Sequence, residues 1–390
     1  MAMPRLWGRL LLGVWVVCAL GCGTAADRAS SENVGLRLVK VYGEPEGSEQ
    51  PASPEGIPGE PGKSLSGLTF GAVVDVAQGA DGQVIVLDGG FRRLVGLDLD
   101  GSVAWTRELP EGEGPGEFRE PWLLASVPGS RIAIFDQALN RIHYADEWGH
   151  LEQDPVVLRH GTRIVDMAFD RTGHTWTVPL LLPDSDFAAL VFARDGRADR
   201  DAFPRNVRDR EYSWGSSSGR LALGADGRVL YAHGQPGTWT EWSELDGYHR
   251  YGDEAFPGVT PAVQGPPERP RPMVSFPAWV VGIGELPGGE VAIVYHALAA
   301  FLDGQEWVVR PGSGEAQRVR HFLDLFDPRG RYLGTAEFPA GPAELGWEAW
   351  SGRVAYISSE TGRILIPGHG LTDIVAEFEV VRMSQEPAQE

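Results

Sequence analysis

The feature that most constrains the fold of this chain is an internal repeat. Residues 81–101 read DGQVIVLDGGFRRLVGLDLDG, and residues 128–149 repeat this pattern as PGSRIAIFDQALNRIHYADEWG. Asp88 recurs as Asp136, and the glycine that ends the first segment recurs at the same separation. Short alternating strands that repeat at about 40–50 residues are typical of propeller blades, which stack around a ring. The repeat therefore predicts a β-propeller.

A glycine at a hairpin turn, followed by an alternating run, recurs six times in the body of the chain. The six glycines are Gly82, Gly129, Gly173, Gly227, Gly289 and Gly352. No helical period of comparable length separates these runs, which excludes βαβ units. We therefore expect an all-β fold, a six-bladed β-propeller with about four antiparallel strands per blade, over residues 65–383, followed by a tail at 384–390.

The N-terminus predicts export. Basic residues precede an apolar run at residues 10–20, which is shorter than the about 20 residues of a transmembrane helix. The run ends in Ala-Leu-Gly-Cys, which resembles the lipobox of bacterial lipoproteins. That resemblance implies a signal peptide at residues 1–21 and diacylglycerol on Cys22, with Ala19 standing where the family usually has Leu. An ordinary signal peptide with a chance cysteine is the alternative.

The residues that follow Cys22 predict a tether. Residues 43–64 are mostly Pro, Gly, Glu and Ser, a composition that cannot offset the entropy of ordering the chain. We assign residues 22–64 to the acylated cysteine and its Pro/Gly/Glu-rich tether. Within it, residues 34–42 alternate like a strand and are a candidate for closing the ring. Gly23 after the cysteine, where Asp could stand, resembles lipoproteins that are sent on to the outer membrane, which implies a body in the periplasm or at the cell surface.

Composition restricts the partners of the exported body. The chain has 34 basic and 54 acidic residues, and such a surface repels nucleic acid and anionic lipid headgroups. Cys18 and Cys22 are its two cysteines, so the propeller can hold neither a disulfide nor a thiolate metal site. We expect membrane lipid on Cys22 as a partner, and no nucleic acid, cofactor or metal.

A second resemblance is carried by residues 111–125, EGEGPGEFREPWLLA, and by the repeat that follows them. They resemble the NHL-type six-bladed propellers of exported bacterial lipoproteins, in which a G-x-G-P-G-E-F-x-x-P segment leads into the innermost strand of a blade. The match is close over residues 74–150 and weakest at residues 359–370, which lack the expected Asp and paired turn. The resemblance implies a fold and an exported location, and no single activity.

We interpret the recurrent residues of the repeat and of its glycine-rich motif as structural. The glycines of the motif free the backbone for a turn, Glu117 fits a capping carboxylate and Phe118 fits a wedge between blades. Asp88 and Asp136 fit acceptors for backbone N–H groups, with the arginines of the blade core as their partners.

Ligand-binding residues are expected at the mouth of the central channel, in the loops that lead into the innermost strands. Tryptophan and arginine combine contact area with a polar group and are typical anchors of ligands. The candidates are Arg119, Trp122, Arg163, Asp166, Trp214, Arg220 and Trp279. They favour a module that binds a ligand or a protein, peptide or glycan partner. Packing between blades is the alternative role of the tryptophans.

Catalysis is less favoured than binding. Lactonase-type propellers use Asn among their metal ligands, but Asn33 lies in the tether and Asn140 in an outer turn. Peptide-amidating lyase propellers hold zinc with three histidines, whereas His160, His233 and His296 are out of register. We assign no catalytic residue. A metal-dependent hydrolase or lyase at the channel and a structural subunit of an envelope assembly remain the alternatives.

Overall fold

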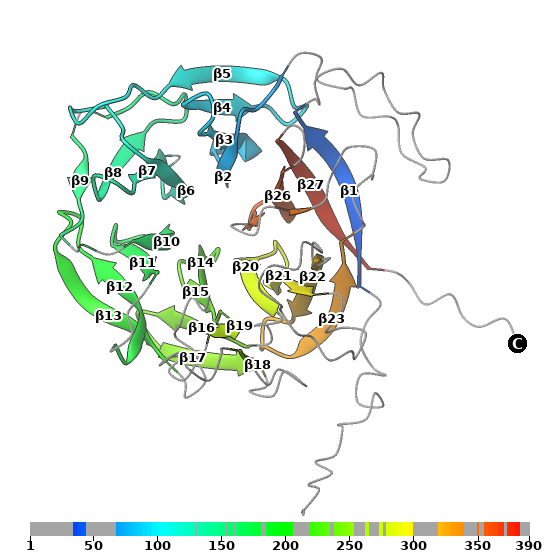
Figure 1. Cartoon of the computed structure of the whole chain (residues 1–390). Helices are drawn as coiled ribbons and strands as arrows, with labels where there is room; N and C mark the ends of the chain where they lie inside the picture. Colours follow the sequence, from blue (N-terminus) through cyan, green and yellow to red (C-terminus); the bar gives the residue numbers. More distant parts are fainter. Residues whose placement is uncertain are drawn as a thin grey trace, which may run out of the picture. The chain divides into compact units, whose positions relative to one another are not determined.

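The fold is a ring of antiparallel sheets (Figure 1). The computed structural model describes residues 34–43, 68–129, 131–152, 154–159, 161, 163–180, 185–205, 219–234, 238–252, 262–264, 273–275, 278–298, 319–338, 349–350, 355–369 and 373–382. The expected signal peptide, Cys22, Trp214 and the tail at 384–390 lie outside these residues.

Five blades are four-stranded meanders in which the first strand lies nearest the axis and the fourth lies outermost (Figure 1). In chain order their strands are β2 (Val73–Gln78), β3 (Val84–Asp88), β4 (Arg93–Leu97) and β5 (Val103–Glu108); β6 (Pro121–Val127), β7 (Arg131–Asp136), β8 (Arg141–Ala145) and β9 (Val156–Val157); β10 (Ile164–Phe169), β11 (Thr175–Pro179), β12 (Phe187–Phe192) and β13 (Ala198–Pro204); β14 (Arg220–Leu223), β15 (Val229–Ala232), β16 (Thr238–Ser243) and β17 (Gly247–Gly252); and β20 (Ala278–Glu285), β21 (Val291–Leu298), β22 (Val319–Phe326) and β23 (Tyr332–Glu337).

The sixth blade takes its outermost strand from the N-terminal part of the chain. β1 (Val34–Tyr42) pairs antiparallel with β27 (Ile374–Arg382), which pairs with β26 (Arg363–His369). The inner strand of this blade comes in two pieces, β24 (Ala349–Trp350) and β25 (Tyr356–Ile357), both paired with β26. The two ends of the described chain thus meet in one sheet, which closes the ring and leaves no open edge between first and last blade. The expected six-bladed β-propeller is confirmed.

Polar contacts reinforce this closure. The Tyr42 hydroxyl donates a hydrogen bond to the buried carboxylate of Glu377. Arg363 of β26 donates to Glu379 at 2.9 Å and lies 3.3 Å from Glu377. Since β1 belongs to the ring, residues 44–67 join two strands of the propeller, and only residues 23–33 separate Cys22 from β1.

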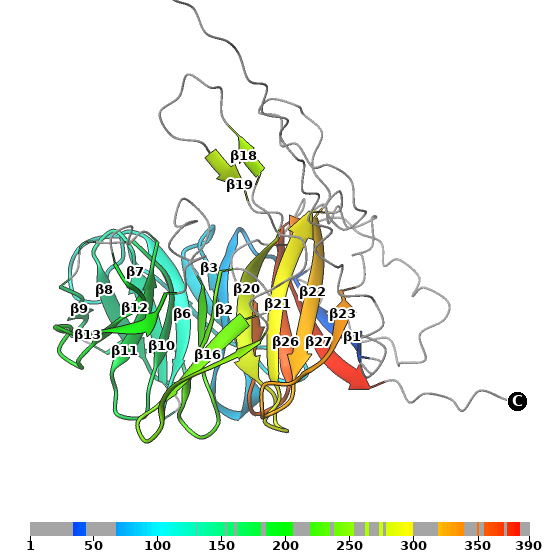
Figure 2. The ribbon, with the colours of Figure 1, turned by 90° about the horizontal axis from the view of Figure 1, so that it is seen from below.

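The connections define two faces of the ring (Figure 2). Turns between first and second strands, and between third and fourth strands, lie at one end, which we call the hairpin face. The first of these turns contains the short 3-10 helix η1 (Ala80–Gly82). The strand ends on the opposite side form the loop face. The two-stranded pair β18 (Ala262–Gln264) and β19 (Met273–Ser275) lies between β17 and β20 in the chain.

The hairpin glycines fit the predicted pattern in five blades. Gly82, Gly129, Gly173, Gly227 and Gly289 all have positive φ in the turn after the innermost strand, a conformation that glycine adopts without steric cost. In the sixth blade that position is held by Gly362 (φ 69°), between β25 and β26. The prediction of Gly352 placed this turn one strand too early, because the innermost strand of that blade is split.

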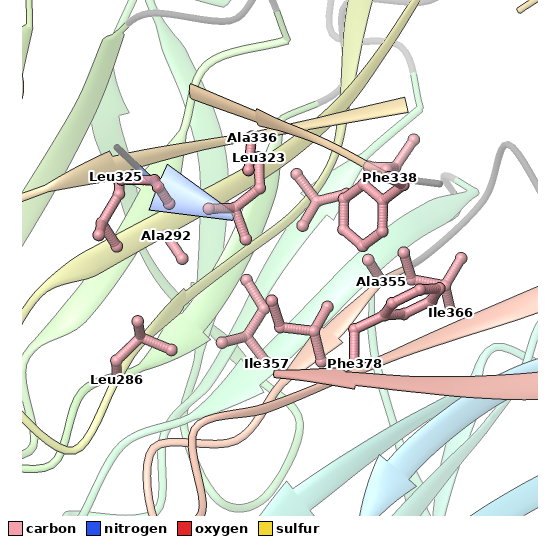
Figure 3. Close-up of a cluster of buried hydrophobic side chains, with 14 of the residues drawn as sticks. Leu286, Ala292, Leu323, Leu325, Ala336, Phe338, Ala355, Ile357, Ile366 and Phe378 are labelled. Atoms are coloured by element: carbon pink, nitrogen blue, oxygen red, sulfur yellow. The ribbon is translucent and has the colours of Figure 1, made fainter. Parts of the chain in front are cut away.

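Apolar side chains fill the spaces between neighbouring blades. In the cluster shared by the fifth and sixth blades, Leu323 and Leu325 of β22 pack with Ile357 and Phe378 of the last blade (Figure 3). Phe118, which is fully buried, packs among side chains of the first and second blades, as expected for a wedge. Each blade therefore depends on its neighbours for burial, which is why the ring folds as one unit.

The recurrent aspartates of the repeat, Asp88 and Asp136, are structural, as expected. Asp88 is fully buried and accepts hydrogen bonds from the backbone N–H groups of Gly71, Ala72 and Phe91 and from Nε of Arg93. Asp136 repeats this pattern in the next blade, where it accepts from three backbone N–H groups at 2.7–3.3 Å.

The glycine-rich motif is held by two charged side chains. Glu117 caps the turn by accepting the N–H of Gly114 at 2.7 Å. Arg141 donates to the carbonyl oxygens of Glu113 (2.9 Å) and Gly114 (3.0 Å), and thus binds the motif where a pairing with an aspartate was expected. These contacts fix the loop that leads into β6.

Candidate functional site

Three titratable side chains meet on the axis of the ring. Asp75 of β2, Asp166 of β10 and Arg220 of β14 each lie on an innermost strand, seven residues before the hairpin glycine of their blade. In β2 and β10 a register shift immediately precedes the aspartate. Such a bulge re-aims the side chain that follows it. Equivalent positions of three blades therefore direct charge to one place.

The two aspartates link neighbouring blades. Asp75 accepts the N–H of Val76 at 2.8 Å and that of Leu124, on the innermost strand of the second blade, at 2.7 Å. Asp166 accepts the N–H of Met167 at 2.9 Å and that of Leu221, in the fourth blade, at 2.7 Å. Each carboxylate thus satisfies a backbone donor next to its bulge and another across the gap between blades.

Arg220 continues this pattern towards the fifth blade. Its Nε donates to the carbonyl of Val281 at 3.3 Å and its Nη1 donates to that of Gly219 at 3.0 Å. Burial lowers the pKa of the Arg220 guanidinium, and the neighbouring Asp166 and Asp75 oppose this shift. The arginine is thus held among carbonyl and carboxylate oxygens, where its charge is compensated.

Burial also sets the charge of the aspartates. It raises the pKa of Asp75 to about 8, against the effect of the two N–H groups that it accepts, and raises that of Asp166 to about 6, where Arg220 opposes the shift. At neutral pH, Asp75 is therefore mostly protonated and Asp166 mostly ionised. The buried group consequently contains one carboxylate and one guanidinium, which nearly cancel in charge.

A cavity of about 560 Å³ lies on the axis beside these side chains. All six blades contribute to its lining, and Asp166 and Arg220 form part of its wall. Ser126 and Tyr356 supply hydroxyl groups there; Ser126 donates to the carbonyl of Gln78 at 2.6 Å and lies 3.4 Å from the Tyr356 hydroxyl. A volume of several hundred Å³ with a few convergent polar groups is typical of a small-molecule site.

The cavity extends to the hairpin face, where charged side chains of both signs surround it. Asp81, Arg131, Arg171 and Glu360 line this end. Arg131 lies 2.9 Å from Glu152, and Arg171 donates to the carbonyl of Ala225. The arrangement suits a polar ligand that presents both hydrogen-bond donors and acceptors.

The structure separates the predicted site residues that it describes into three groups. Asp166 and Arg220 line the cavity. Arg119 and Arg163 are exposed near the loop face, where Arg119 lies 3.1 Å from Glu113 and Arg163 lies 3.9 Å from Glu120. The half-buried Trp122 and Trp279 pack against apolar clusters between blades.

Sequence reasoning missed Asp75. Its position relative to Gly82 matches that of Asp166 relative to Gly173, and this spacing was the signal that could have found it. Gly282 and Ala355 hold the same position in the fifth and sixth blades and line the cavity; a Cβ atom on Gly282 would clash with the Ala355 carbonyl oxygen.

The described histidines do not assemble a metal centre. Across the part of the chain that the structure describes, no group of three His, Cys, Asp or Glu side chains is placed to hold a metal ion. His233 lies 3.0 Å from Thr240, and His296 packs edge-on against Trp279. His160, the third histidine considered for zinc, lies outside the described residues. No helix in the described ranges is long and apolar enough to cross a membrane.

Comparisons with known proteins support the fold. No family model matches the chain, and no curated protein matches it. Among solved structures, a member of the DUF4221 family from Bacteroides vulgatus is similar over 91% of this chain and 100% of its own, with 10% identity and a TM-score of 0.56. A Bacteroides fragilis protein assigned as exported is similar over 83% of this chain and 93% of its own, with 12% identity and a TM-score of 0.52.

Virginiamycin B lyase from Staphylococcus aureus is also similar, over 80% of this chain and 98% of its own, with 12% identity and a TM-score of 0.45. At that score the likeness carries no argument about chemistry. The class that fold and comparisons define is the six-bladed β-propeller.

Proposed function

We propose that this protein is an exported, lipid-anchored β-propeller of NHL type that binds a small polar ligand in its axial cavity. The observation that carries the proposal is the cavity of about 560 Å³ to which all six blades contribute. A ring of blades fixes the wall of such a site from every side, so the ligand is bound without large movement of the protein.

The polar groups of the wall indicate the ligand's chemistry. Arg220 presents a guanidinium and Asp166 a carboxylate, while Ser126 and Tyr356 offer hydroxyl groups. A molecule that carries a carboxylate together with hydroxyl or amino groups matches this set, because charge-assisted hydrogen bonds are stronger than neutral ones. Sugar acids and amino acids are the first classes to test.

Binding should depend on the arginine at the hairpin end of the cavity. We expect Arg171→Ala to weaken binding of the ligand about tenfold, the loss of about 1.4 kcal/mol that one charge-assisted contact supplies. The measurement is isothermal titration of sugar acids and amino acids into the Cys22→Ser protein. Arg194→Ala is the matched control: Arg194 lies in the same blade and also donates to a backbone carbonyl, at 2.8 Å, but does not line the cavity. Equal loss in both variants would contradict the assignment of the site.

The anchor is tested separately. We expect Cys22→Ser to move the protein from the membrane fraction to the soluble fraction, since stable attachment needs the acyl chains on this residue. Immunoblots of fractionated cells measure the distribution, and Cys18→Ser, within the same leader, is the control that should leave it unchanged. Membrane association that persists in Cys22→Ser argues against acylation.

One observation favours a second role on the loop face. Arg119 and Arg163 are exposed close to the half-buried Trp122. Arginine and tryptophan are enriched where proteins hold partners. A protein, peptide or glycan partner at the loop face is therefore the second candidate.

A further inference from the structure

The hairpin face carries two features that point the same way: exposed apolar turn tips and the exit of the N-terminal chain. From them we infer that this face docks on the surface of a phospholipid bilayer. The inference rests on the proposed lipid anchor for its geometry and commits to a membrane as the partner.

The apolar tips occupy corresponding turns. Leu99, Trp148 and Leu245 lie in the turns that join the third and fourth strands of the first, second and fourth blades. Their exposed fractions are 68%, 52% and 93%. Single exposed apolar side chains are common on proteins. Here they repeat at one structural position, on one face, around the circumference of the ring.

The backbone holds these tips rigidly. The turn beneath Leu99 is closed by the Gly101 N–H, which donates to the Asp98 carbonyl at 2.7 Å, and the turn beneath Trp148 is closed in the same way by Gly149 at 3.0 Å. A rigid tip loses little conformational freedom when it enters another phase. Tryptophan and leucine are residues that settle at the boundary between headgroups and acyl chains.

The N-terminal chain leaves the ring at the same face. Val34, the first residue of β1, pairs with Arg382, and Arg382 forms an ion pair with Glu290 in a hairpin turn of the fifth blade. Residues 23–33 separate Cys22 from β1, and a chain of that length spans at most on the order of 40 Å. An acyl chain on Cys22 would thus be joined to the ring at the hairpin face.

Charge specifies the kind of lipid. Asp100, Glu147 and Asp246 lie beside the three apolar tips, and the chain has a net charge of −20. The same face also carries Arg131, Arg171, Arg197 and Arg331 in its hairpin turns, so it presents carboxylates and guanidinium groups together. The matching surface is therefore zwitterionic, as in phosphatidylcholine or phosphatidylethanolamine.

The test places a fluorophore on single introduced cysteines in the acylated protein, reconstituted in phosphatidylcholine–phosphatidylethanolamine vesicles that contain spin-labelled lipid. Leu99→Cys and Leu245→Cys report on the hairpin face. Phe91→Cys and Leu180→Cys are matched controls, because these residues are also exposed and apolar (55% and 36%) and lie at turns of the loop face. All four side chains project from turns, and circular dichroism verifies the fold of each variant.

We expect the spin-labelled lipid to quench the fluorophores at positions 99 and 245 at least threefold more than those at 91 and 180. Vesicles rich in phosphatidylglycerol should reduce this difference. Equal quenching at both faces, or stronger quenching at the loop face, overturns the proposal.

A second arm separates docking from acylation. The Cys22→Ser protein, with a histidine tag in front of residue 22, is held on nickel-chelating lipid at the same point of the chain. If Cys22 is not acylated but the tagged protein shows the expected quenching, the anchor proposal fails and docking stands. If Cys22 is acylated and quenching does not distinguish the faces, the anchor stands and docking fails.

Discussion

Replacing Asp88 by alanine should destabilise the propeller by about 3–5 kcal/mol, the range measured when one partner of a buried, charged network is removed. Asp88 itself is fully buried, and its loss removes the acceptor of the part-buried N–H groups of Gly71, Ala72 and Phe91 and of Nε of Arg93. The free energy of unfolding from urea denaturation measures the effect.

Two further variants serve as comparisons for Asp88→Ala. Asp100→Ala removes an aspartate that also accepts a backbone N–H, from Ser102 at 2.8 Å, but in an exposed turn of the same blade. It should cost about 0.5 kcal/mol, as surface substitutions do. Asp88→Asn keeps an acceptor oxygen and should fall between the two. A cost for Asp88→Ala no larger than that for Asp100→Ala would show that the network does not hold the blade.

The stability of the protein should pass through a maximum near pH 6.5. On the acid side, burial lowers the pKa of His143 to about 4, of His321 to about 3 and of His296 to about 2, from 6.5. The unfolded chain therefore takes up these protons first as the pH falls below 6.5. Because the three imidazoles stay neutral in the folded protein, the free energy of unfolding falls steadily as the pH drops from 6.5 to their folded pKa values.

The axial aspartates act in the opposite sense. Burial raises the pKa of Asp75 to about 8 and that of Asp166 to about 6, so the fold retains protons that the unfolded chain releases above about pH 4. Their contribution is complete below pH 4 and is lost as the pH rises through these values. Between pH 4 and 6, the unfolded chain binds about one proton more than the folded protein, because unfolding lets three histidines take up protons and two aspartates release them. The free energy of unfolding therefore rises by about 1.4 kcal/mol per pH unit in this range. Between pH 6.5 and 8, the free energy of unfolding falls again, because Asp75 gradually loses the proton that it holds in the folded protein.

His143→Leu isolates one of these contributions. Neither ring nitrogen of His143 has a hydrogen-bond partner among the described residues, and the ring lies 4.1 Å from that of Phe118. Between pH 6.5 and pH 5, the free energy of unfolding should fall by about 2 kcal/mol less in the variant than in the wild-type protein. His249→Gln, at an exposed position of β17, is the control. A wild-type pH profile in His143→Leu would contradict the assignment.

The sequence predicted the parts of the fold that repeat. Asp88 and Asp136 were recognisable because one residue type recurs at one separation, and their scaffold role followed from turn chemistry. The axial position was harder to find, since it holds Asp75, Asp166 and Arg220 in three blades but glycine or alanine in two others. A position whose residue type changes from blade to blade gives no pattern in a single sequence.

The end of the axis at which the cavity emerges could not be predicted either. It depends on how closely the innermost strands approach, and hence on small side chains such as Ala222, Gly282 and Ala355 that line the cavity. Likewise, residues 34–42 were recognisable as a strand, but their partner lies more than 330 residues away in the sequence. Such long-range pairing is decided by the packing of the whole ring.

The pairing of β1 with β27 has a consequence for proteolysis. A single cut anywhere in residues 44–67 would divide the protein into a short N-terminal piece and a long piece that carries five complete blades. The short piece would still supply the outer strand of the sixth, with Val34 and Tyr42 buried against it. If Cys22 carries the proposed acyl chains, a protease that severs the backbone there would therefore not release the propeller from the membrane. Release would require that a strand nine residues long be peeled from its sheet.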